Sequence, residues 1–337
     1  MRRRMFFISI AMILGIITIG GLGSLNLYLF AHAPGPGPEQ IILIEAGSSL
    51  QKIAATLRKQ ELISSRGKFI LLNRILGNAT RLQAGEYRLH AAATPLAIID
   101  SMKNGRILLR RITIPEGFTL AQIGTILQDA DLCRPEDFVG ITSAPDLLAQ
   151  WNITGENAEG YLFPSTYNYS RQTSCRQLIE MMLNAGQESW RALTNSPAAP
   201  EAQILNRRQL ITMASIIQKE AGNKAEMPLI ASVFYNRLRR GMRLESDPTT
   251  IYALGENFDG NLRHRDLRHP SPYNTYRHHG LPPGPICSPG NDALRAALRP
   301  DRSDYLYFVA TQNGGHQFSR TFREHLQAVE KYQRRPH

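Results

Sequence analysis

Glu220 ends an apolar segment with helical periodicity, Leu210–Glu220, and Gly222 follows two residues later. Ile216 and Ile217 precede Glu220 by four and three positions, so a helix would place the carboxylate over its buried stripe. Burial disfavours the charged form of an acid and raises its pKa, which suits a group kept protonated for chemistry. The plain alternative is a glutamate that caps a structure or extends from the helix end into water.

Asp247 is a second acid whose sequence context predicts a specific role, at the start of a short helix. An amphipathic helix is predicted between Glu226 and Gly241, and Ser246–Thr250 should open a short helix after it. We expect Asp247 to be the N-cap of that helix, with Pro248 at its first position. Contact between Asp247 and a substrate is the alternative.

A long loop is predicted from Arg263 to Pro289, because its many prolines and glycines cannot form a helix or a ladder. Long ordered loops often bind ligands, although packing on the core is the alternative here. Tyrosines can stack on sugar faces, while Asn and Thr can hydrogen-bond hydroxyl and acetamido groups. The polar and aromatic residues that we expect to contact substrate are Tyr273, Asn274, Thr275 and Tyr276.

A hairpin is predicted near the C-terminus. Tyr305–Ala310 has the pattern of a buried strand, Asn313–Gly315 is typical of a turn, and His316–Ser319 would return. His316 is expected either to orient a substrate or to be a structural histidine.

The first half of the chain contains an internal repeat, which precedes the segments that carry these candidate site residues. Ile44–Leu50 recurs as Ile114–Leu120, each a short strand, a glycine turn and a hydroxyl N-cap before an amphipathic helix. Thr119 and Gln122 have the spacing of a capping box. Weaker copies follow at Ala84–Tyr87 and Glu159–Tyr161, so two strand–helix–helix units are predicted in tandem.

The N-terminus is predicted to be a membrane anchor. Three arginines at positions 2–4 precede an uncharged apolar stretch over 5–30, which is long enough to cross a bilayer. The arginines place residues 1–4 in the cytoplasm and the rest outside. Ala31–Ala33 resembles a signal-peptidase site, but the apolar stretch is longer than a cleaved signal requires. Residues 31–38 are expected to be a stiff Pro/Gly linker.

Composition excludes several classes of function. The net charge is +11, which favours an anionic partner, but an exported domain without nucleic-acid motifs argues against DNA or RNA. Phosphate-binding, dinucleotide-binding, serine-hydrolase and zinc-protease motifs are absent from the sequence. His278 and His279 are adjacent and lack metal-ligand spacing. We therefore expect neither a cofactor nor a metal. The anionic partner that the positive charge favours would be peptidoglycan, an acidic polymer found outside the cytoplasm.

Three cysteines occur, so disulfides cannot organise the whole fold. One pair could form outside the cytoplasm. Cys133–Cys175 is the preferred pair, which leaves Cys287 as a free thiol.

The motifs together resemble the membrane-anchored endolytic murein transglycosylases of bacteria. The matching stretches are Glu159–Tyr167, Ala214–Glu220, Ser232–Leu238, Met242–Thr249, Tyr273–Tyr276 and Gly280–Ile286. The resemblance implies that Glu220 is the catalytic acid. Three positions depart from the commoner pattern: Gln218 replaces Glu, Ser165 replaces Asp and Glu245 replaces Gln.

The strand–helix–helix pattern of residues 39–111 separately resembles a LysM-type carbohydrate-binding module. We therefore expect an α+β protein with a transmembrane helix over 5–30, a LysM-like module over 39–111 and a mixed α+β catalytic domain over 112–337. A LysM-like module would bind N-acetylglucosamine polymers, and a structural spacer is the alternative. Without a second essential carboxylate, Glu220 would both protonate the bond between N-acetylmuramic acid and N-acetylglucosamine and activate the sugar's own C6 hydroxyl. The expected products are strands with 1,6-anhydro ends.

The implied enzyme would be anchored in the inner membrane with its catalytic domain in the periplasm, cutting nascent strands and limiting their length. Peptidoglycan synthases are the protein partners that this role suggests. A hydrolase using water, or a peptidoglycan-binding protein without activity, are the two alternatives.

Overall fold

The computed structural model describes residues 2–90 and 92–334. The chain forms two compact units, the first containing Met1–Arg110 with Asn168–Gln172, and the second Arg111–Tyr167 with Thr173–His337. Over the described residues, helices and three two-stranded sheets make up the chain, which confirms an α+β fold.

The first unit begins with the long helix α1 (Arg2–His32). Its segment Phe6–His32 has a mean hydropathy of 2.3 in its most apolar window, which is exposed, so it is long and apolar enough to cross a membrane. Phe30 and Ala31 at its end are buried in the core of the unit. The Pro/Gly segment after it also contacts the unit, because the Gly35 and Gly37 amides donate to Ala93 and Glu61 carbonyls. It is therefore not a free spacer.

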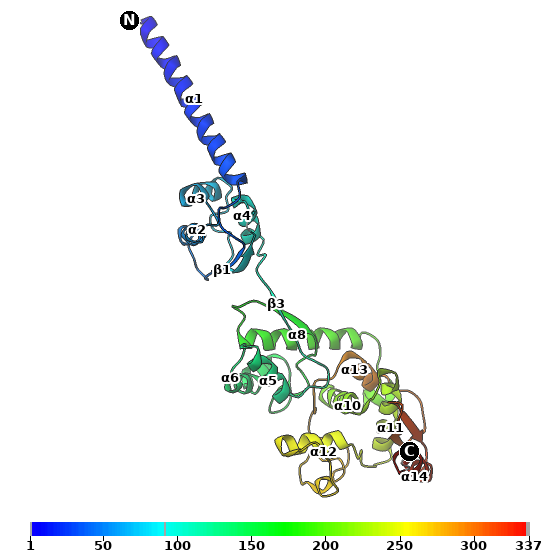
Figure 1. The fold of residues 1–337 in the computed structure, drawn as a ribbon. Coiled ribbons are helices and arrows are strands. Elements are labelled where there is room, and N and C mark those ends of the chain that lie inside the picture. Colours follow the sequence, from blue (N-terminus) through cyan, green and yellow to red (C-terminus); the bar gives the residue numbers. More distant parts are fainter. Residues whose placement is uncertain (1, 91, 335–337) are drawn as a thin grey trace. The chain divides into compact units, whose positions relative to one another are not determined.

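The rest of the first unit is a small α+β module. Its elements are β1 (Gln40–Ile44), α2 (Leu50–Lys59), α3 (Arg66–Ile75), β2 (Gly85–Leu89) and α4 (Pro95–Lys103). β1 and β2 are antiparallel, with Ile42 opposite Tyr87. The helices α2, α3 and α4 pack with this ribbon around a core that includes Leu57 and Phe69 (Figure 1).

The second unit opens with the same order of elements, which confirms the internal repeat. The elements of this second copy are β3 (Arg110–Thr113), α5 (Leu120–Asp129), α6 (Pro135–Thr142), α7 (Pro145–Gln150), β4 (Thr166–Tyr169) and α8 (Cys175–Thr194), and α7 has no counterpart in the first copy. β3 pairs with β4, as β1 pairs with β2. Ser49 and Thr119 are equivalent N-caps, and Thr119 forms the predicted capping box with Gln122.

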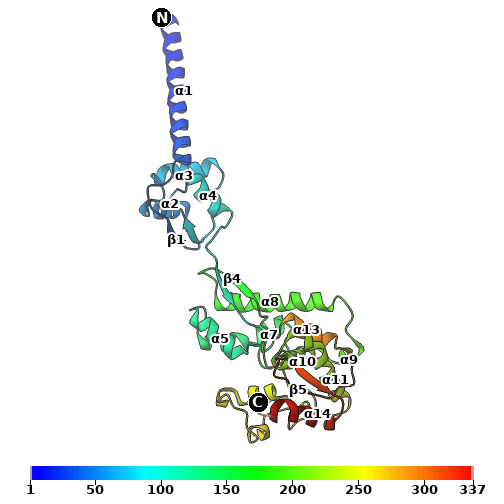
Figure 2. The same cartoon turned by 45° about the vertical axis from the view of Figure 1, so that its right-hand side comes forward.

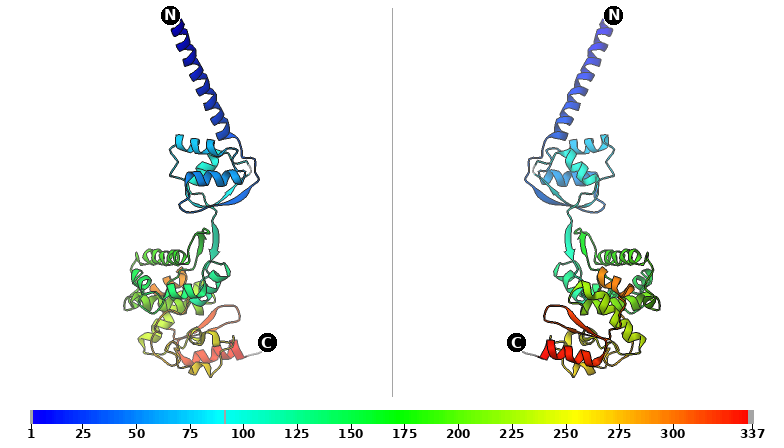
Figure 3. Two further views of the ribbon diagram at one scale, coloured as in Figure 1. Left: turned by 90° about the vertical axis from the view of Figure 1, so that its left-hand side faces the viewer. Right: turned by 90° about the vertical axis from the view of Figure 1, so that its right-hand side faces the viewer.

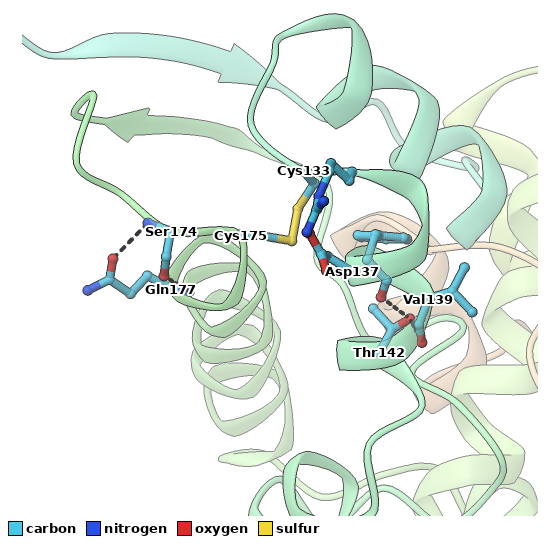
Figure 4. Close-up of a disulfide and its surroundings, with 9 residues drawn as sticks. Cys133, Asp137, Val139, Thr142, Ser174, Cys175 and Gln177 are labelled. Atoms are coloured by element: carbon cyan, nitrogen blue, oxygen red, sulfur yellow. Dashed lines mark hydrogen bonds and ion pairs between the residues drawn. A yellow bond between two sulfur atoms is a disulfide. The ribbon is translucent and has the colours of Figure 1, made fainter.

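A disulfide joins Cys133 to Cys175, as the sequence predicted (Figure 4). Their Cα atoms are 5.1 Å apart, and the bond connects the turn before α6 to the first residue of α8. Ser174 caps α8 at that point, with its amide bonded to Gln177 (Figure 4). The third cysteine, Cys287, is free and buried.

The core of the second unit surrounds α10. The elements here are α9 (Pro200–Gln203), α10 (Arg207–Glu220), η1 (Lys224–Glu226), α11 (Met227–Arg239), α12 (Asp247–Leu254), η2 (Gly255–Asn257), η3 (Asp266–Arg268) and α13 (Asn291–Leu298). α13 packs against α10, α11 and α8, and Figure 2 shows these helices together. Eight consecutive residues of α10, Leu210–Ile217, are buried, so its end is held rigidly. Residues 263–289 form the predicted loop, interrupted only by η3.

The C-terminal part is a hairpin covered by a helix. β5 (Tyr307–Ala310) and β6 (His316–Ser319) are antiparallel, with Val309 opposite Gln317, which confirms the predicted hairpin. α14 (Phe322–Val329) and the π-helical turn η4 (Glu330–Arg334) follow. α14 packs against both strands (Figure 3). This helix was not among the elements predicted from the sequence.

Candidate active site

Glu220 is the last residue of α10, as predicted, and its side chain faces a pocket of about 440 Å³. Burial raises the pKa of its carboxyl to about 7. A hydrogen bond from the Ser246 hydroxyl to Oε1, at 2.5 Å, opposes this rise, the negative charge of Asp247 adds to it, and Arg237 opposes it. Near neutral pH, Glu220 can therefore both donate and accept a proton.

The pocket brings together segments far apart in the chain. Its walls are the end of α10, the turn before α12, the loop at Tyr276, the hairpin β5–β6 and the C-terminal helix. The lining residues are Glu220, Arg237, Leu244, Glu245, Asp247, Tyr276, Tyr307, Phe308, Val309, Ala310, His316, Phe322, His325, Val329 and Gln333.

The turn that holds Ser246 and Asp247 is rigid. Glu245 has a φ of 52°, a left-handed conformation that is costly for a residue with a side chain. The buried Ser246 amide donates to Thr275 Oγ1 at 3.0 Å. Beneath the turn, the guanidinium of Arg237 donates to the carbonyls of Leu244 and Leu306, at 2.8 and 2.7 Å. These contacts fix the position of the Ser246 hydroxyl, which donates to Glu220. The sequence did not predict this role of Ser246.

The expectation that Asp247 caps α12 was wrong. Ser246 is the N-cap residue and makes no side-chain capping bond, while Asp247 is the first residue of the helix. Its Oδ1 instead accepts a hydrogen bond from the Tyr276 hydroxyl at 2.6 Å. Both residues line the pocket, and burial raises the pKa of Tyr276, so the phenol remains a donor. Asp247 is therefore a second carboxylate beside Glu220.

The loop residues expected to bind substrate divide into two groups. Tyr276 lines the pocket, but Asn274 and Thr275 are 0% and 1% exposed and cannot reach a ligand. The Asn274 amide donates to the carbonyls of Leu267 and His269, which holds the loop together. Tyr273 lies outside the pocket lining and packs its ring on that of Tyr252, with centroids 5.0 Å apart. For Asn274 and Thr275 the structure supports a structural role, while substrate contact by Tyr273 stays a prediction.

His316 lines the pocket and is held by Glu226. Its Nδ1 lies 2.9 Å from Glu226 Oε2, and its amide donates to Oε1 of the same carboxylate at 3.0 Å. Burial alone would raise the pKa of Glu226, but these hydrogen bonds lower it. When Nδ1–H of His316 donates to the Glu226 carboxylate, Nε2 is the His316 nitrogen that does not bond to Glu226. Glu226 was missed because its partner is 90 residues away.

Two other polar residues have structural partners. Gln218 accepts a hydrogen bond from the Gly290 amide at 2.9 Å, so it ties α10 to the start of α13. Glu159 is a second buried acid whose pKa burial raises to about 7. It accepts hydrogen bonds from the Leu120 amide at the start of α5 and from the Tyr252 hydroxyl, and it lies outside the Glu220 pocket.

A larger pocket, of about 640 Å³, lies between the start of α10 and the loop Gly280–Pro283. Its lining includes Arg208, whose Nε donates to the Pro283 carbonyl at 2.9 Å. Glu220 is not part of this pocket. The proton-transfer chemistry therefore belongs to the smaller one.

Comparison with known proteins agrees with this geometry. Residues 42–331 match the model of the YceG-like family. An endolytic murein transglycosylase of Bacillus subtilis is 37% identical over 86% of this chain and 84% of its own length. One from Streptococcus pneumoniae is 32% identical over 92% of this chain, which spans 62% of that relative.

A solved structure is also similar. The crystal structure of a YceG-like protein from Listeria monocytogenes is 33% identical, with a TM-score of 0.59, and the match covers 86% of this chain and 98% of that one. The match with the family model spans most of the chain, and the Bacillus relative exceeds one-third identity over nearly its whole length. The chain therefore belongs to the YceG-like family of endolytic murein transglycosylases.

Proposed function

We propose that the protein is a lytic transglycosylase that cuts peptidoglycan strands internally, at the bond between N-acetylmuramic acid and N-acetylglucosamine. The observation that carries this proposal is the raised pKa of Glu220: burial brings it to about 7, and the carboxyl lines a pocket. Membership of a family whose similar members are endolytic murein transglycosylases supports the reaction class.

In the first step, Glu220 donates its proton to the bridging oxygen as the bond from that oxygen to the anomeric carbon breaks. Oε1 of Glu220 accepts a hydrogen bond from the Ser246 hydroxyl, so the proton that Glu220 transfers is on Oε2. Positive charge develops on the sugar ring, and the Asp247 carboxylate lies in the same pocket to stabilise it. The Tyr276 hydroxyl holds that carboxylate in place.

In the second step, the C6 hydroxyl of the muramic acid residue attacks its own anomeric carbon. Glu220, now a carboxylate, takes the hydroxyl proton and returns to its starting state. The product is a 1,6-anhydro ring, and no water is consumed. Attack within one sugar avoids the entropic cost of bringing in a second molecule.

Asp247 makes a hydrolase the competing proposal. Asp247 does not cap α12, and its side chain lines the Glu220 pocket. A second carboxylate could activate a water for hydrolysis. Mass analysis and borohydride reduction of cut strands distinguish the two reactions. We expect ends that weigh one water less and resist reduction, and mainly reducible muramic ends would establish a hydrolase instead.

We propose further that α1 anchors the enzyme in the inner membrane, with residues 1–4 in the cytoplasm and the catalytic unit in the periplasm. Support comes from the apolar length of α1 and the arginines before it. From that position the enzyme would cut nascent strands, next to peptidoglycan synthases, and limit strand length. N-terminal sequencing of the mature protein tests the anchor, because a chain that begins after Ala33 would show cleavage.

The module over 39–111 is proposed to bind glycan as a LysM-like domain. Its support is the strand–helix–helix order and the antiparallel closure by β2. Deleting it should weaken retention on isolated sacculi without preventing cleavage of short chains. If the full-length protein and the protein without residues 39–111 are retained equally, the module is a spacer.

A further inference from the structure

The C-terminal helix forms one wall of the Glu220 pocket, although none of the sequence motifs falls in it. α14 and η4 present His325, Val329 and Gln333 to the pocket. Their spacing of four residues places them along one helix face. Phe322, one turn before His325, lines the pocket from the first position of α14.

Two rings of this wall, those of Phe322 and His325, form a cluster with Tyr307 of β5. Tyr307 and His325 are stacked, with centroids 5.3 Å apart and planes inclined by 23°. Phe322 lies 5.8 Å from Tyr307 and 6.3 Å from His325. The Arg237 guanidinium lies 5.1 Å from the Tyr307 centroid, so a cation also holds this ring in place. Burial and Arg237 lower the pKa of His325, so its ring is neutral at neutral pH.

Phe322 is the unexpected member of the cluster. It is 58% exposed, although it lines the pocket that contains Glu220. An exposed aromatic ring contributes little to folding, because most of its apolar surface remains in water. A ligand that covers it would recover that contribution.

The pocket lining therefore has two kinds of surface. Glu220, Asp247 and Tyr276 supply carboxylates and a hydroxyl, while the ring cluster supplies apolar faces. An N-acetylhexosamine has the complementary character, with hydroxyl and acetamido groups around a ring whose faces expose C–H bonds. We infer that Phe322, held by the stacked rings of Tyr307 and His325, forms a subsite that stacks against the ring face of one N-acetylhexosamine of the glycan strand. This inference rests on the proposed function, since the same pocket must admit the strand.

Binding measured without cleavage tests the subsite. Full-length Glu220→Gln protein in detergent is titrated calorimetrically with a tetrasaccharide of alternating N-acetylglucosamine and N-acetylmuramic acid that lacks stem peptides. Adding Phe322→Ala should raise the Kd about fivefold, which corresponds to about 1 kcal/mol. Phe322→Trp should retain the affinity, because it keeps an aromatic face.

Leu326→Ala is the matched control. Leu326 is one helical turn beyond Phe322 and 49% exposed, but it is outside the pocket lining. Its substitution should leave the Kd unchanged. An unchanged Kd for Phe322→Ala, equal losses for Phe322→Ala and Leu326→Ala, or no binding of the tetrasaccharide would each overturn the subsite. The proposed function is judged separately, by the ends that the unsubstituted enzyme produces.

Discussion

Replacing Glu220 by Gln should stabilise the second unit at pH 8 while it abolishes activity. The pKa of Glu220 is about 7 in the folded protein, against an ordinary value of 4.5. An acid with a raised pKa in the folded state lowers stability once the pH exceeds its unfolded value. That loss begins near pH 4.5, grows until about pH 7 and stays constant above it. Glutamine avoids the loss, because it is neutral and its amide oxygen can still accept from Ser246.

The magnitude follows from the two pKa values. Their difference corresponds to about 3 kcal/mol, at about 1.4 kcal/mol for each pKa unit. The side chain is partly open to the pocket, and water there screens the charge, so we expect about 1–2 kcal/mol at pH 8 and almost none at pH 4. For a unit of this size, each kcal/mol raises the Tm by about 2–4 °C.

Tryptophan fluorescence during urea unfolding can measure this gain in the intact chain. Both tryptophans, Trp151 and Trp190, belong to the second unit, so the signal reports that unit alone. The exposed Glu256 provides the control, because Glu256→Gln should change stability little at either pH. If Glu220→Gln is no more stable than the unsubstituted protein at pH 8, or gains equally at pH 4, then Glu220 is not the desolvated acid proposed above.

Three further changes test the site and its support. Ser246→Ala removes a hydrogen bond that holds the pKa of Glu220 down, so the alkaline limb of kcat/KM should move up by about one pH unit; an unmoved limb would contradict this. Asp247→Asn removes a charge that raises the same pKa, so the limb should move down and kcat should fall about 10–100-fold. Retained kcat would exclude electrostatic stabilisation by Asp247. Cys133→Ser with Cys175→Ser should cost the second unit about 2–4 kcal/mol in urea unfolding, and a reductant should then have no additional effect.

Local rules predicted most elements of the fold, because their causes lie within a few residues. The repeat at Ile44 and Ile114, the capping box of Thr119 and the hairpin before His316 were all confirmed. Glu220 was placed correctly at the end of its helix by the apolar residues before it.

The same local rules failed where a distant contact competes. Asp247 has the sequence context of an N-cap, but the Tyr276 hydroxyl, 29 residues away, provides a different partner. A loop rich in proline and glycine is predictable, but the direction of each side chain is not. Asn274 and Thr275 therefore turned out to be buried within the loop, while Tyr276 reaches the pocket.

Composition, periodicity and motif order were enough to predict the apolar N-terminal helix, the repeat, the family and the single acid most suited to proton transfer. Tertiary structure alone decided what surrounds that acid. Ser246, whose hydroxyl meets Glu220, is 26 residues from it along the chain. His316 reaches the pocket while held by Glu226, which is 90 residues away from it, and the rings of α14 come from the C-terminal end of the described chain. The pKa of Glu220 depends on burial and nearby charges in space, and only folding brings these together.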